Sequence, residues 1–470
     1  MGRDELQRVL EQVASHAAAY RAGVGDRPQR PETSYAETKA RFLAPLPVEG
    51  APLAAVIEEL MAIATPGLAA MTGPRFFGWV IGATEPAGLA ADWLTSAWGQ
   101  NTGNALATPS AAAAEEASAR WLLELLDLPR EASVGFVTGA TIANFTCLAA
   151  ARGEALRRVG WDADASGLFG APPIHVVLGE DAHSTVFSAL RYLGLGYDRV
   201  LRVAVDRNGR MRADAFAEAV RDLNGPLIAI AQVGHLHSGA IDPIGEIAPI
   251  VRAKGGWLHV DGAFGLWARA APDLAHHAMG VDLADSWAVD GHKWLQTPHD
   301  CGYAIVRDAK AHYRAMQIAA SYLPAGEERH PSDYVPELSR RARGFTTWAM
   351  IRSLGRDGIA RMVSRHCALA RRFAERLGAE PGVEIMNDVM LNQVAVRFGA
   401  DLDDTHADAL TERLIARVQQ EGECFLAGAH WRGKQIVRLS IISAGTTKAD
   451  IDRSAAAILS AWRAERGANS

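Results

Sequence analysis

The sequence has few cysteines and no long apolar or strongly basic stretch. Its four cysteines in 470 residues stand far apart and form no CxxC pair, which favours reduced thiols over a disulfide framework. No apolar run is long enough to cross a membrane. The net charge is -6, and no Lys/Arg run or basic tail is present. We therefore expect neither nucleic acid nor a membrane as a partner. The cysteines are Cys147, Cys301, Cys367 and Cys424.

The first residues, MGRDELQRVLEQ, contain acidic side chains and lack the apolar region of a secretory signal. N-myristoylation needs Ser or Thr at position 6, where this chain has Leu6. Together with the cysteine pattern, these features predict a cytoplasmic protein.

Composition and length predict a globular protein of two to three domains, because 49% of the 470 residues are hydrophobic and 22% are charged. In residues 1–72 we expect amphipathic helices broken by a proline-rich linker, packed on another domain or subunit. Residues 73–357 are expected to form a large α/β domain. Residues 358–470 start with a long helical pattern and are expected to form a small α+β domain.

Seven short apolar runs alternate with helical patterns after Pro129. Near-continuous apolar strands separated by helices are typical of a mainly parallel sheet that is covered on both faces. The last run follows its predecessor closely, which favours an antiparallel strand. The seven runs are VGFVT (134–138), IHVVLG (174–179), VLRVAV (200–205), PLIAIAQV (226–233), WLHVD (257–261), SWAVD (286–290) and GYAIVR (302–307).

The strongest chemical signal is the segment ADSWAVDGHKWLQTPHDCG, in which Lys293 follows an apolar strand and is flanked by His292 and Trp294. Burial of a lysine disfavours its charged form and makes the amine nucleophilic, which suits a Schiff base with a carbonyl cofactor. Taken alone, the segment also fits a lysine that extends to the surface.

A carboxylate, Asp261, ends the predicted strand WLHVD, at the sheet edge where open α/β sheets bind ligands. Such a carboxylate is able to pair with a protonated ring nitrogen of a cofactor. A helix cap or a turn residue is the alternative.

Two further elements suit an anion and a planar ring. In VTGATIANF, the turn Gly139, Ala140 and Thr141 leads from a strand into a helix, whose N-terminus favours a phosphate. The turn lacks the lysine of nucleoside-triphosphate loops and also fits an ordinary strand-to-helix connection. In EDAHSTVFSAL, His183 precedes a helix and is expected either to cap it or to stack on a cofactor.

In order and spacing, these elements resemble the group II pyridoxal-phosphate-dependent amino-acid decarboxylases, the family of aromatic-L-amino-acid, histidine and glutamate decarboxylases. The resemblance runs from PRFFGWV at Pro74 to TTKADID near Asp452, and HKW between ADSW and DCG is its most specific part. It implies the fold type I, aspartate-aminotransferase-like scaffold, with pyridoxal 5'-phosphate as cofactor and no metal.

The resemblance also implies residue roles. Lys293 is expected to form the internal aldimine, and Asp261 to hold the pyridine nitrogen. The expected ring and phosphate contacts are Ala263 near the ring, His183 stacked on it, His237 near its hydroxyl, Ala140, Thr141 and His292 at the phosphate, and Gly355 reaching the phosphate from a partner subunit. The substrate-binding candidates are Trp79, Gly82, Asn101, His299 and Arg438, and Arg438 fits a salt bridge beneath a sheet equally well.

Tyr322, in AASYLPAGEE, occupies the place of the family's loop tyrosine, which helps to protonate the quinonoid carbon. Relatives with phenylalanine there tend to be aldehyde synthases, so Tyr322 favours simple decarboxylation. An aromatic anchor for the loop is the alternative.

Several positions depart from the family pattern. Asp290 stands where the family often has Asn, and a carboxylate there would repel a phosphate unless it were turned away. His237 replaces a small polar residue, and His299 stands where Tyr or Phe is usual. These changes argue against a catechol or indole substrate, and polar residues at 101, 104, 237 and 299 favour one with hydrogen-bonding or acidic character.

From these features we expect decarboxylation of an L-amino acid through an aldimine and a quinonoid intermediate, in a homodimer with shared active sites. Oxidative deamination to an aldehyde and transamination are the alternatives on the same scaffold. A cofactor-binding scaffold without activity is disfavoured, because Lys293, Asp261 and Tyr322 are all present.

Overall fold

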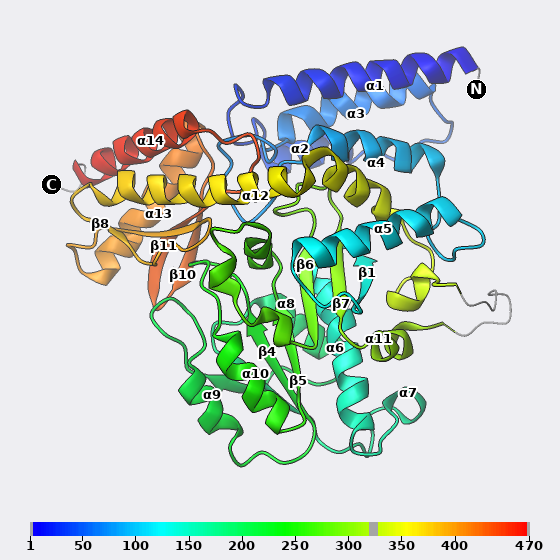
Figure 1. Ribbon diagram of the computed structural model, residues 1–470. Coiled ribbons are helices and arrows are strands. Elements are labelled where there is room, and N and C mark those ends of the chain that lie inside the picture. The colour runs from blue at the N-terminus through cyan, green and yellow to red at the C-terminus, as the bar shows by residue number, and fades with distance from the viewer. Residues whose placement is uncertain (1–2, 319–327, 468–470) are drawn as a thin grey trace. The chain divides into compact units, whose positions relative to one another are not determined.

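The computed structural model describes residues 3–318 and 328–467 (Figure 1). The chain divides into two compact units. The first unit comprises Met1–Trp79, Arg372–Ile385 and Val396–Ser470, and the second comprises Val80–Arg371 and Met386–Ala395. The division into three parts at residues 72 and 357 stays a prediction.

A seven-stranded sheet organises the second unit, with the strand order β1-β7-β6-β5-β4-β2-β3. All neighbouring strands are parallel except β7, which is antiparallel to both β1 and β6. The predicted α/β class, the mainly parallel sheet and the antiparallel last strand are confirmed. The strands are β1 (Ser133–Val137), β2 (His175–Gly179), β3 (Leu201–Val203), β4 (Leu227–Gln232), β5 (Trp257–Asp261), β6 (Ser286–Asp290) and β7 (Gly302–Val306).

Helices cover both faces of this sheet. The connections β1 to β2 and β2 to β3 run one way along the sheet, whereas β3 to β4 and β4 to β5 run the other way. Because parallel crossovers are right-handed, connections of opposite direction place their helices on opposite faces. The helices of this unit are α4 (Pro86–Trp98), α5 (Pro109–Leu125), α6 (Ala140–Arg157), α7 (Ala163–Ser166), α8 (Ser184–Tyr192), α9 (Ala213–Val220), α10 (Ile244–Ala253) and α11 (Ala309–Met316).

The interior of the second unit is rich in tryptophan. Four indoles are at most 1% exposed, and each donates its ring N–H to a buried acceptor. This satisfies the one polar atom that a buried tryptophan carries into an apolar core. The four are Trp257, Trp267, Trp287 and Trp294.

The long helix α12 (Arg343–Gly378) passes from the second unit into the first and is interrupted at Gly355. There the backbone has φ 62° and ψ 173°, which a residue with a Cβ adopts only at a cost. The expected helix from residue 357 is therefore the second segment of a longer, kinked helix.

The first unit combines helices with a four-stranded sheet of order β10-β11-β9-β8, in which β10–β11 and β8–β9 pair antiparallel. Strands β8, β9 and β11 lie in the segments near VEIMND, NQVAVRF and IVRLSII. Strand β10, AGAHW, was not predicted, because small residues and a histidine give it no apolar run. The elements are α1 (Arg3–Gly23), α2 (Tyr35–Phe42), α3 (Leu53–Ala64), β8 (Val383–Ile385), β9 (Gln393–Phe398), α13 (Asp404–Glu421), β10 (Ala427–Trp431), β11 (Lys434–Ser440) and α14 (Lys448–Gly467).

In residues 3–318 and 328–467, no helix combines the length and the apolar character that a membrane span requires. Over the same part of the chain, no group of three or more His, Cys, Asp or Glu side chains is arranged to hold a metal ion.

Candidate functional site

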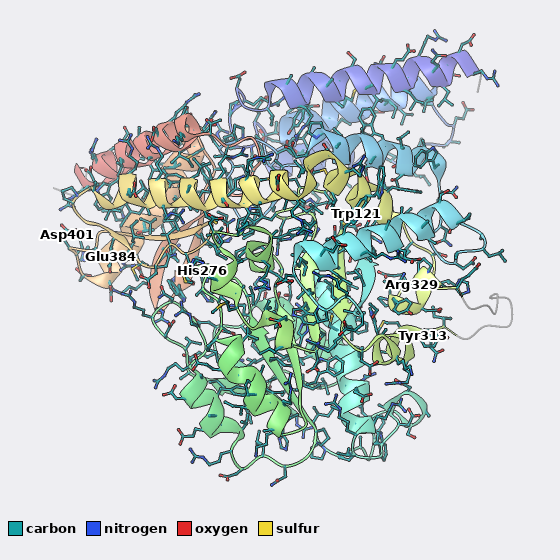
Figure 2. All side chains as sticks on the ribbon, viewed as in Figure 1. Trp121, His276, Tyr313, Arg329, Glu384 and Asp401 are labelled. Atoms are coloured by element: carbon teal, nitrogen blue, oxygen red, sulfur yellow. The ribbon has the colours of Figure 1, made fainter. Side chains whose placement is uncertain are left out.

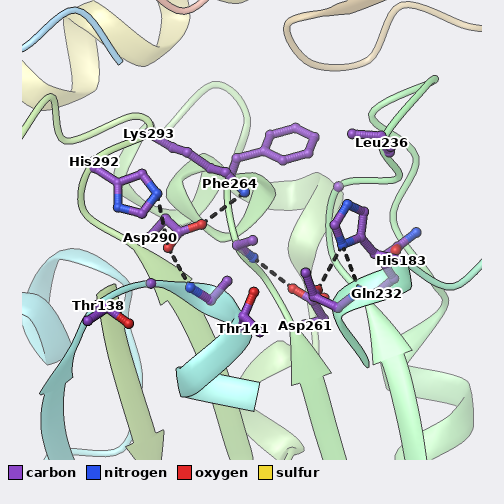
Figure 3. A pocket seen from close by; sticks show the side chains of 15 residues that line it. Thr138, Thr141, His183, Gln232, Leu236, Asp261, Phe264, Asp290, His292 and Lys293 are labelled. Atoms are coloured by element: carbon purple, nitrogen blue, oxygen red, sulfur yellow. Dashed lines mark hydrogen bonds and ion pairs between the residues drawn. The ribbon is translucent and has the colours of Figure 1, made fainter. Parts of the chain in front are cut away.

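A cavity of about 290 Å³ opens where the carboxyl ends of several strands of the large sheet converge (Figure 3). Parallel strands end at the same edge of a sheet, so residues far apart in sequence meet there. Seven of the residues predicted for the site line this cavity: Ala140, Thr141, His183, Asp261, Ala263, His292 and Lys293.

Lys293 and Asp290 form an ion pair on one side of the cavity. The Lys293 Nζ lies 2.9 Å from Asp290 Oδ2, and the Asp290 side chain is only 3% exposed. Burial by itself raises the pKa of a carboxyl, but Lys293, His292 and the amide N–H of Ala140 together hold the pKa of Asp290 below its ordinary value. The carboxylate is therefore ionised and is turned into the site.

The tautomer of His292 follows from its two contacts. Its Nδ1 accepts a hydrogen bond from the Cys301 N–H at 3.2 Å, so the neutral ring carries its proton on Nε2. That nitrogen lies 3.6 Å from Asp290 Oδ1. Burial lowers the pKa of His292, although the charge of Asp290 opposes this.

The expected phosphate turn lies at the start of α6, as predicted, but one of its donors is already engaged. The Ala140 N–H donates to Asp290 Oδ1 at 2.6 Å. Gly139 lies close behind, and a Cβ on it would come within 2.9 Å of His292 Cε1. The turn thus brings a helix N-terminus, a histidine and a carboxylate to one corner of the cavity.

Asp261 lies at the end of β5 and is 4% exposed. Its Oδ1 accepts the Ala263 N–H and its Oδ2 accepts the Asn144 Nδ2–H, both at 3.2 Å. Two donors thus hold the carboxylate at the floor of the cavity. Asn144 was not predicted as a site residue, although a lone amide in the apolar stretch ATIANFTCLAAA of α6 is an available signal.

His183 caps helix α8. Its Nδ1 accepts the Thr185 N–H at 3.4 Å and lies 2.8 Å from Thr185 Oγ1. Capping the helix is one of the two roles predicted for His183. Because the capping hydrogen bond uses Nδ1, which lies in the plane of the ring, the face of the ring remains available for stacking. The ring lies at the cavity beside Gln232 and Asp261 (Figure 3).

Two other predicted residues contact the Lys293 segment. The Gly82 N–H donates to the His292 carbonyl oxygen at 2.9 Å, and a Cβ at position 82 would lie 2.3 Å from the Lys293 carbonyl oxygen. The His299 ring stacks on His292 with ring centroids 4.3 Å apart. Burial lowers the pKa of His299 to about 4, so this ring is neutral at physiological pH.

Other candidates lie apart from this lining. Leu236 lines the cavity, whereas the neighbouring His237 packs with its ring 5.4 Å from that of His235. The Asn101 side chain accepts the Arg340 N–H at 2.9 Å. Gly355 forms the kink of α12.

Three residues predicted for the site are not placed at this cavity. Trp79 and Arg438 belong to the first unit, where Arg438 hydrogen-bonds Ser440 and burial lowers the pKa of its guanidinium to about 10. Tyr322 lies outside the described residues. Their roles stay predictions.

Comparison with known proteins identifies the family of this chain. The model of the pyridoxal-dependent decarboxylase conserved domain matches residues 37–399. Tryptophan decarboxylase 1 of Oryza sativa subsp. japonica is 26% identical, over 94% of this chain and 90% of its own. The 4-hydroxyphenylacetaldehyde synthase of Rhodiola rosea is 25% identical, over 96% and 94%.

Solved structures share the fold. The structure of Oryza sativa TDC with PLP and tryptamine superposes with a TM-score of 0.92 at 23% identity, covering 99% of both chains. Mouse CSAD superposes with a TM-score of 0.90 at 21% identity, covering 98% of this chain and 99% of its own. The scaffold is thus fold type I. With the family model matching most of its length, the chain belongs to the pyridoxal-dependent decarboxylases, carboxy-lyases whose cofactor is pyridoxal 5'-phosphate.

Proposed function

We propose that the protein removes the α-carboxylate of an L-amino acid as carbon dioxide and releases the corresponding amine. The observation that carries this proposal is the single cavity faced by the Lys293 amine, the buried Asp261 carboxylate and the N-terminus of α6. An amine, a carboxylate and a helix N-terminus are the three groups that an aldehyde, a ring nitrogen and a phosphate require.

The lining suits pyridoxal 5'-phosphate. Lys293 is the amine for its carbonyl group and Asp261 the carboxylate for its ring nitrogen, while Ala263 and Gly234 leave room for a flat ring. Thr141 and the remaining donors of α6 suit its phosphate, whereas the ionised Asp290 at the same corner opposes it and is compensated by the charge of Lys293. When bound, the cofactor supplies an electron sink for the electron pair left by the departing carboxylate.

The protein's own groups manage orientation and protons. Lys293 holds its ammonium against Asp290, so the amine becomes nucleophilic only after it gives up a proton, and Asp290 Oδ2 at 2.9 Å is a near acceptor. His183, fixed by its cap on α8, is placed to hold a planar group against the sheet. From the resemblance, we assign to Tyr322 the return of a proton to the carbon that loses carbon dioxide.

The test is a panel of L-amino acids, including aromatic, acidic and hydroxylated members, with amine, carbon dioxide, aldehyde and hydrogen peroxide measured together. We expect amine and carbon dioxide in equal amounts from at least one amino acid. Recovery of every amino acid intact, with no carbon dioxide, would overturn the proposal. Lys293→Ala is the control, and we expect it to lack both activity and the visible absorbance of the covalently bound cofactor.

Aldehyde formation is the second candidate, because a relative of 25% identity bears the name 4-hydroxyphenylacetaldehyde synthase. It predicts aldehyde, ammonia and hydrogen peroxide in place of amine. Tyr322 favours the first candidate. We expect Tyr322→Phe to move the products toward aldehyde, and an unchanged product ratio would remove Tyr322 from the proposed role.

We further propose a homodimer with shared active sites. Apolar side chains on α4 and α12 support it: Trp98 is 50% exposed, and Trp348, which stacks on Trp121, is 42% exposed. Trp121 lies on α5 and is labelled in Figure 2. Large exposed aromatic side chains are typical of interfaces. Sedimentation that shows a fully active monomer would contradict the dimer.

The cytoplasmic location is also part of this proposal. It is supported by four cysteines that are all free and buried. Recovery of the native protein from an oxidising compartment would contradict it.

A further inference from the structure

A chain of four hydrogen bonds runs through the interior of the large sheet and ends on the carboxylate of Asp261. Trp257 Nε1 donates to Ser286 Oγ at 2.9 Å, and Ser286 Oγ lies 2.9 Å from His259 Nδ1. His259 Nε2 lies 2.8 Å from Asn144 Oδ1, and Asn144 Nδ2 donates to Asp261 Oδ2 at 3.2 Å. The chain thus connects β5, β6 and α6.

Every member of this chain is buried. Asn144, His259 and Ser286 are fully buried, and Asp261 is 4% exposed. Burial lowers the pKa of His259 to about 3, so the ring is neutral and carries one proton. A buried polar group that loses its partner keeps its desolvation cost, so each bond in such a chain depends on its neighbours.

One direction of the chain satisfies both of its ends, and the carboxylate end sets it. The indole of Trp257 is a donor only, so it leaves the Ser286 hydroxyl free to donate to His259 Nδ1. The single ring proton of His259 then sits on Nε2 and is donated to Asn144 Oδ1.

At the other end, a carboxylate is an acceptor only, so Asp261 requires the NH₂ group of Asn144. A flipped Asn144 would turn its carbonyl oxygen against the carboxylate and its NH₂ group toward a protonated His259 nitrogen. All four protons therefore point toward Asp261.

Resting on the proposed function, we propose that Asn144 is the positioning residue for Asp261, and that His259 and Ser286 fix the orientation of its amide. With the Ala263 N–H on Oδ1, the Asn144 amide gives the carboxylate a second fixed donor. A carboxylate held ionised and immobile is the partner that a protonated ring nitrogen requires. Asn144 touches neither substrate nor cofactor in this role and acts through Asp261.

The test compares Asn144→Leu, Ser286→Ala and the double variant in the full-length protein, with pyridoxal 5'-phosphate as the titrated ligand. Loss of one hydrogen bond to a buried charged group predicts a dissociation constant for the cofactor about 10- to 100-fold higher in Asn144→Leu. We expect a changed visible absorbance maximum of the bound cofactor, and a lower kcat with KM for the amino acid nearly unchanged. Ser286→Ala should change the same properties in the same direction but less strongly, with a dissociation constant about two- to fivefold higher. The effect is smaller because Ser286 acts only through the tautomer of His259.

The double variant decides whether the residues act as a chain. If they do, the dissociation constant for the cofactor is no higher in Asn144→Leu/Ser286→Ala than in Asn144→Leu. The reason is that the bond between Ser286 and His259 acts on Asp261 only through the amide of Asn144, which both variants lack. Thr146→Val is the matched control: Thr146 is fully buried on the same helix, is absent from the chain and should leave affinity and spectrum unchanged.

Failure of the inference is distinct from failure of the proposed function. Wild-type protein that binds no pyridoxal 5'-phosphate would overturn the proposed function. Wild-type affinity and an unchanged spectrum in Asn144→Leu, or effects of Asn144 and Ser286 that simply add, would overturn the role of the chain. If the cofactor-free Asn144→Leu variant melts far below wild type, the cofactor affinity and the absorbance maximum of Ser286→Ala test the role of the chain instead. Wild-type values in Ser286→Ala would then overturn it.

Discussion

The ion pair between Lys293 and Asp290 predicts an energetic coupling that can be measured in the cofactor-free protein. The two side chains are 19% and 3% exposed, and the atoms Nζ and Oδ2 lie 2.9 Å apart. Replacing Lys293 by Met leaves Asp290 buried, with the neutral His292 ring as its neighbour, whose Nε2 lies 3.6 Å from Asp290 Oδ1. Replacing Asp290 by Asn removes the opposite charge and keeps an acceptor for the Ala140 N–H.

Two estimates bound the size of the effect. Coulomb's law at an effective dielectric constant of ~20 gives roughly 6 kcal/mol for unit charges at this separation. Breaking a buried pair by removing one partner typically costs about 3–5 kcal/mol. Partial exposure of Lys293 and the nearby His292 reduce both figures, so we expect Lys293→Met to lower the free energy of unfolding by about 2–3 kcal/mol at pH 7.5. The double variant should recover most of this loss.

The loss should depend on pH in a defined direction. In the wild type the pKa of Asp290 lies below its ordinary value, so its contribution to stability is present above about pH 4 and disappears as the pH falls through the folded-state pKa. Without Lys293, burial raises that pKa instead, and the folded variant loses stability as the pH rises. The difference between wild type and Lys293→Met should therefore be largest at pH 7.5 and smaller at pH 4, where the carboxyl of the variant is mostly protonated.

Urea unfolding of the four proteins of this cycle, followed by tryptophan fluorescence at both pH values, measures the coupling. The control cycle is Glu116→Gln with Arg120→Met, a helical pair whose side chains are 50% and 74% exposed and whose coupling should stay below about 0.5 kcal/mol. Additive effects of the Lys293 and Asp290 substitutions, or a coupling that grows toward pH 4, would refute the reasoning.

Three shorter predictions concern packing around the site and elsewhere in the chain. Gly82→Ala should weaken cofactor binding at least tenfold in a fluorescence titration, because its Cβ would lie 2.3 Å from the Lys293 carbonyl oxygen. The control is Gly153→Ala on helix α6, where a Cβ meets nothing within 4 Å, and this change should stabilise the protein by about 0.5–1 kcal/mol. Glu115→Gln should cost about 3–5 kcal/mol in urea unfolding, because it breaks the bidentate pair with Arg340, in which both side chains are at most 2% exposed; a loss below 1 kcal/mol would contradict this. All four thiols are buried with raised pKa values, so a disulfide reagent at pH 8 should react only after unfolding, and a fast reaction in the native protein would be inconsistent with the structure.

Much of the fold and the main site residues could be predicted from local patterns. Each of the seven apolar runs forms a strand of the large sheet, because a strand buried on both faces must be apolar along its length. Lys293 and Asp261 were found because they follow such runs, and parallel strand ends share one edge. Strand β10 was missed because its small residues carry no such pattern.

Local sequence patterns were therefore enough to predict the class of fold, the family and the residues at the strand ends. The atoms that meet at the site depend on the folded chain: Asp290 turns toward Lys293 and accepts the Ala140 N–H, and Leu236 lines the cavity where His237 was expected. The bond from Asn144 to Asp261 joins residues 117 positions apart. The period of apolar residues indicates whether a side chain is buried, but the direction of a hydrogen bond depends on partners that only the folded chain brings within hydrogen-bonding distance.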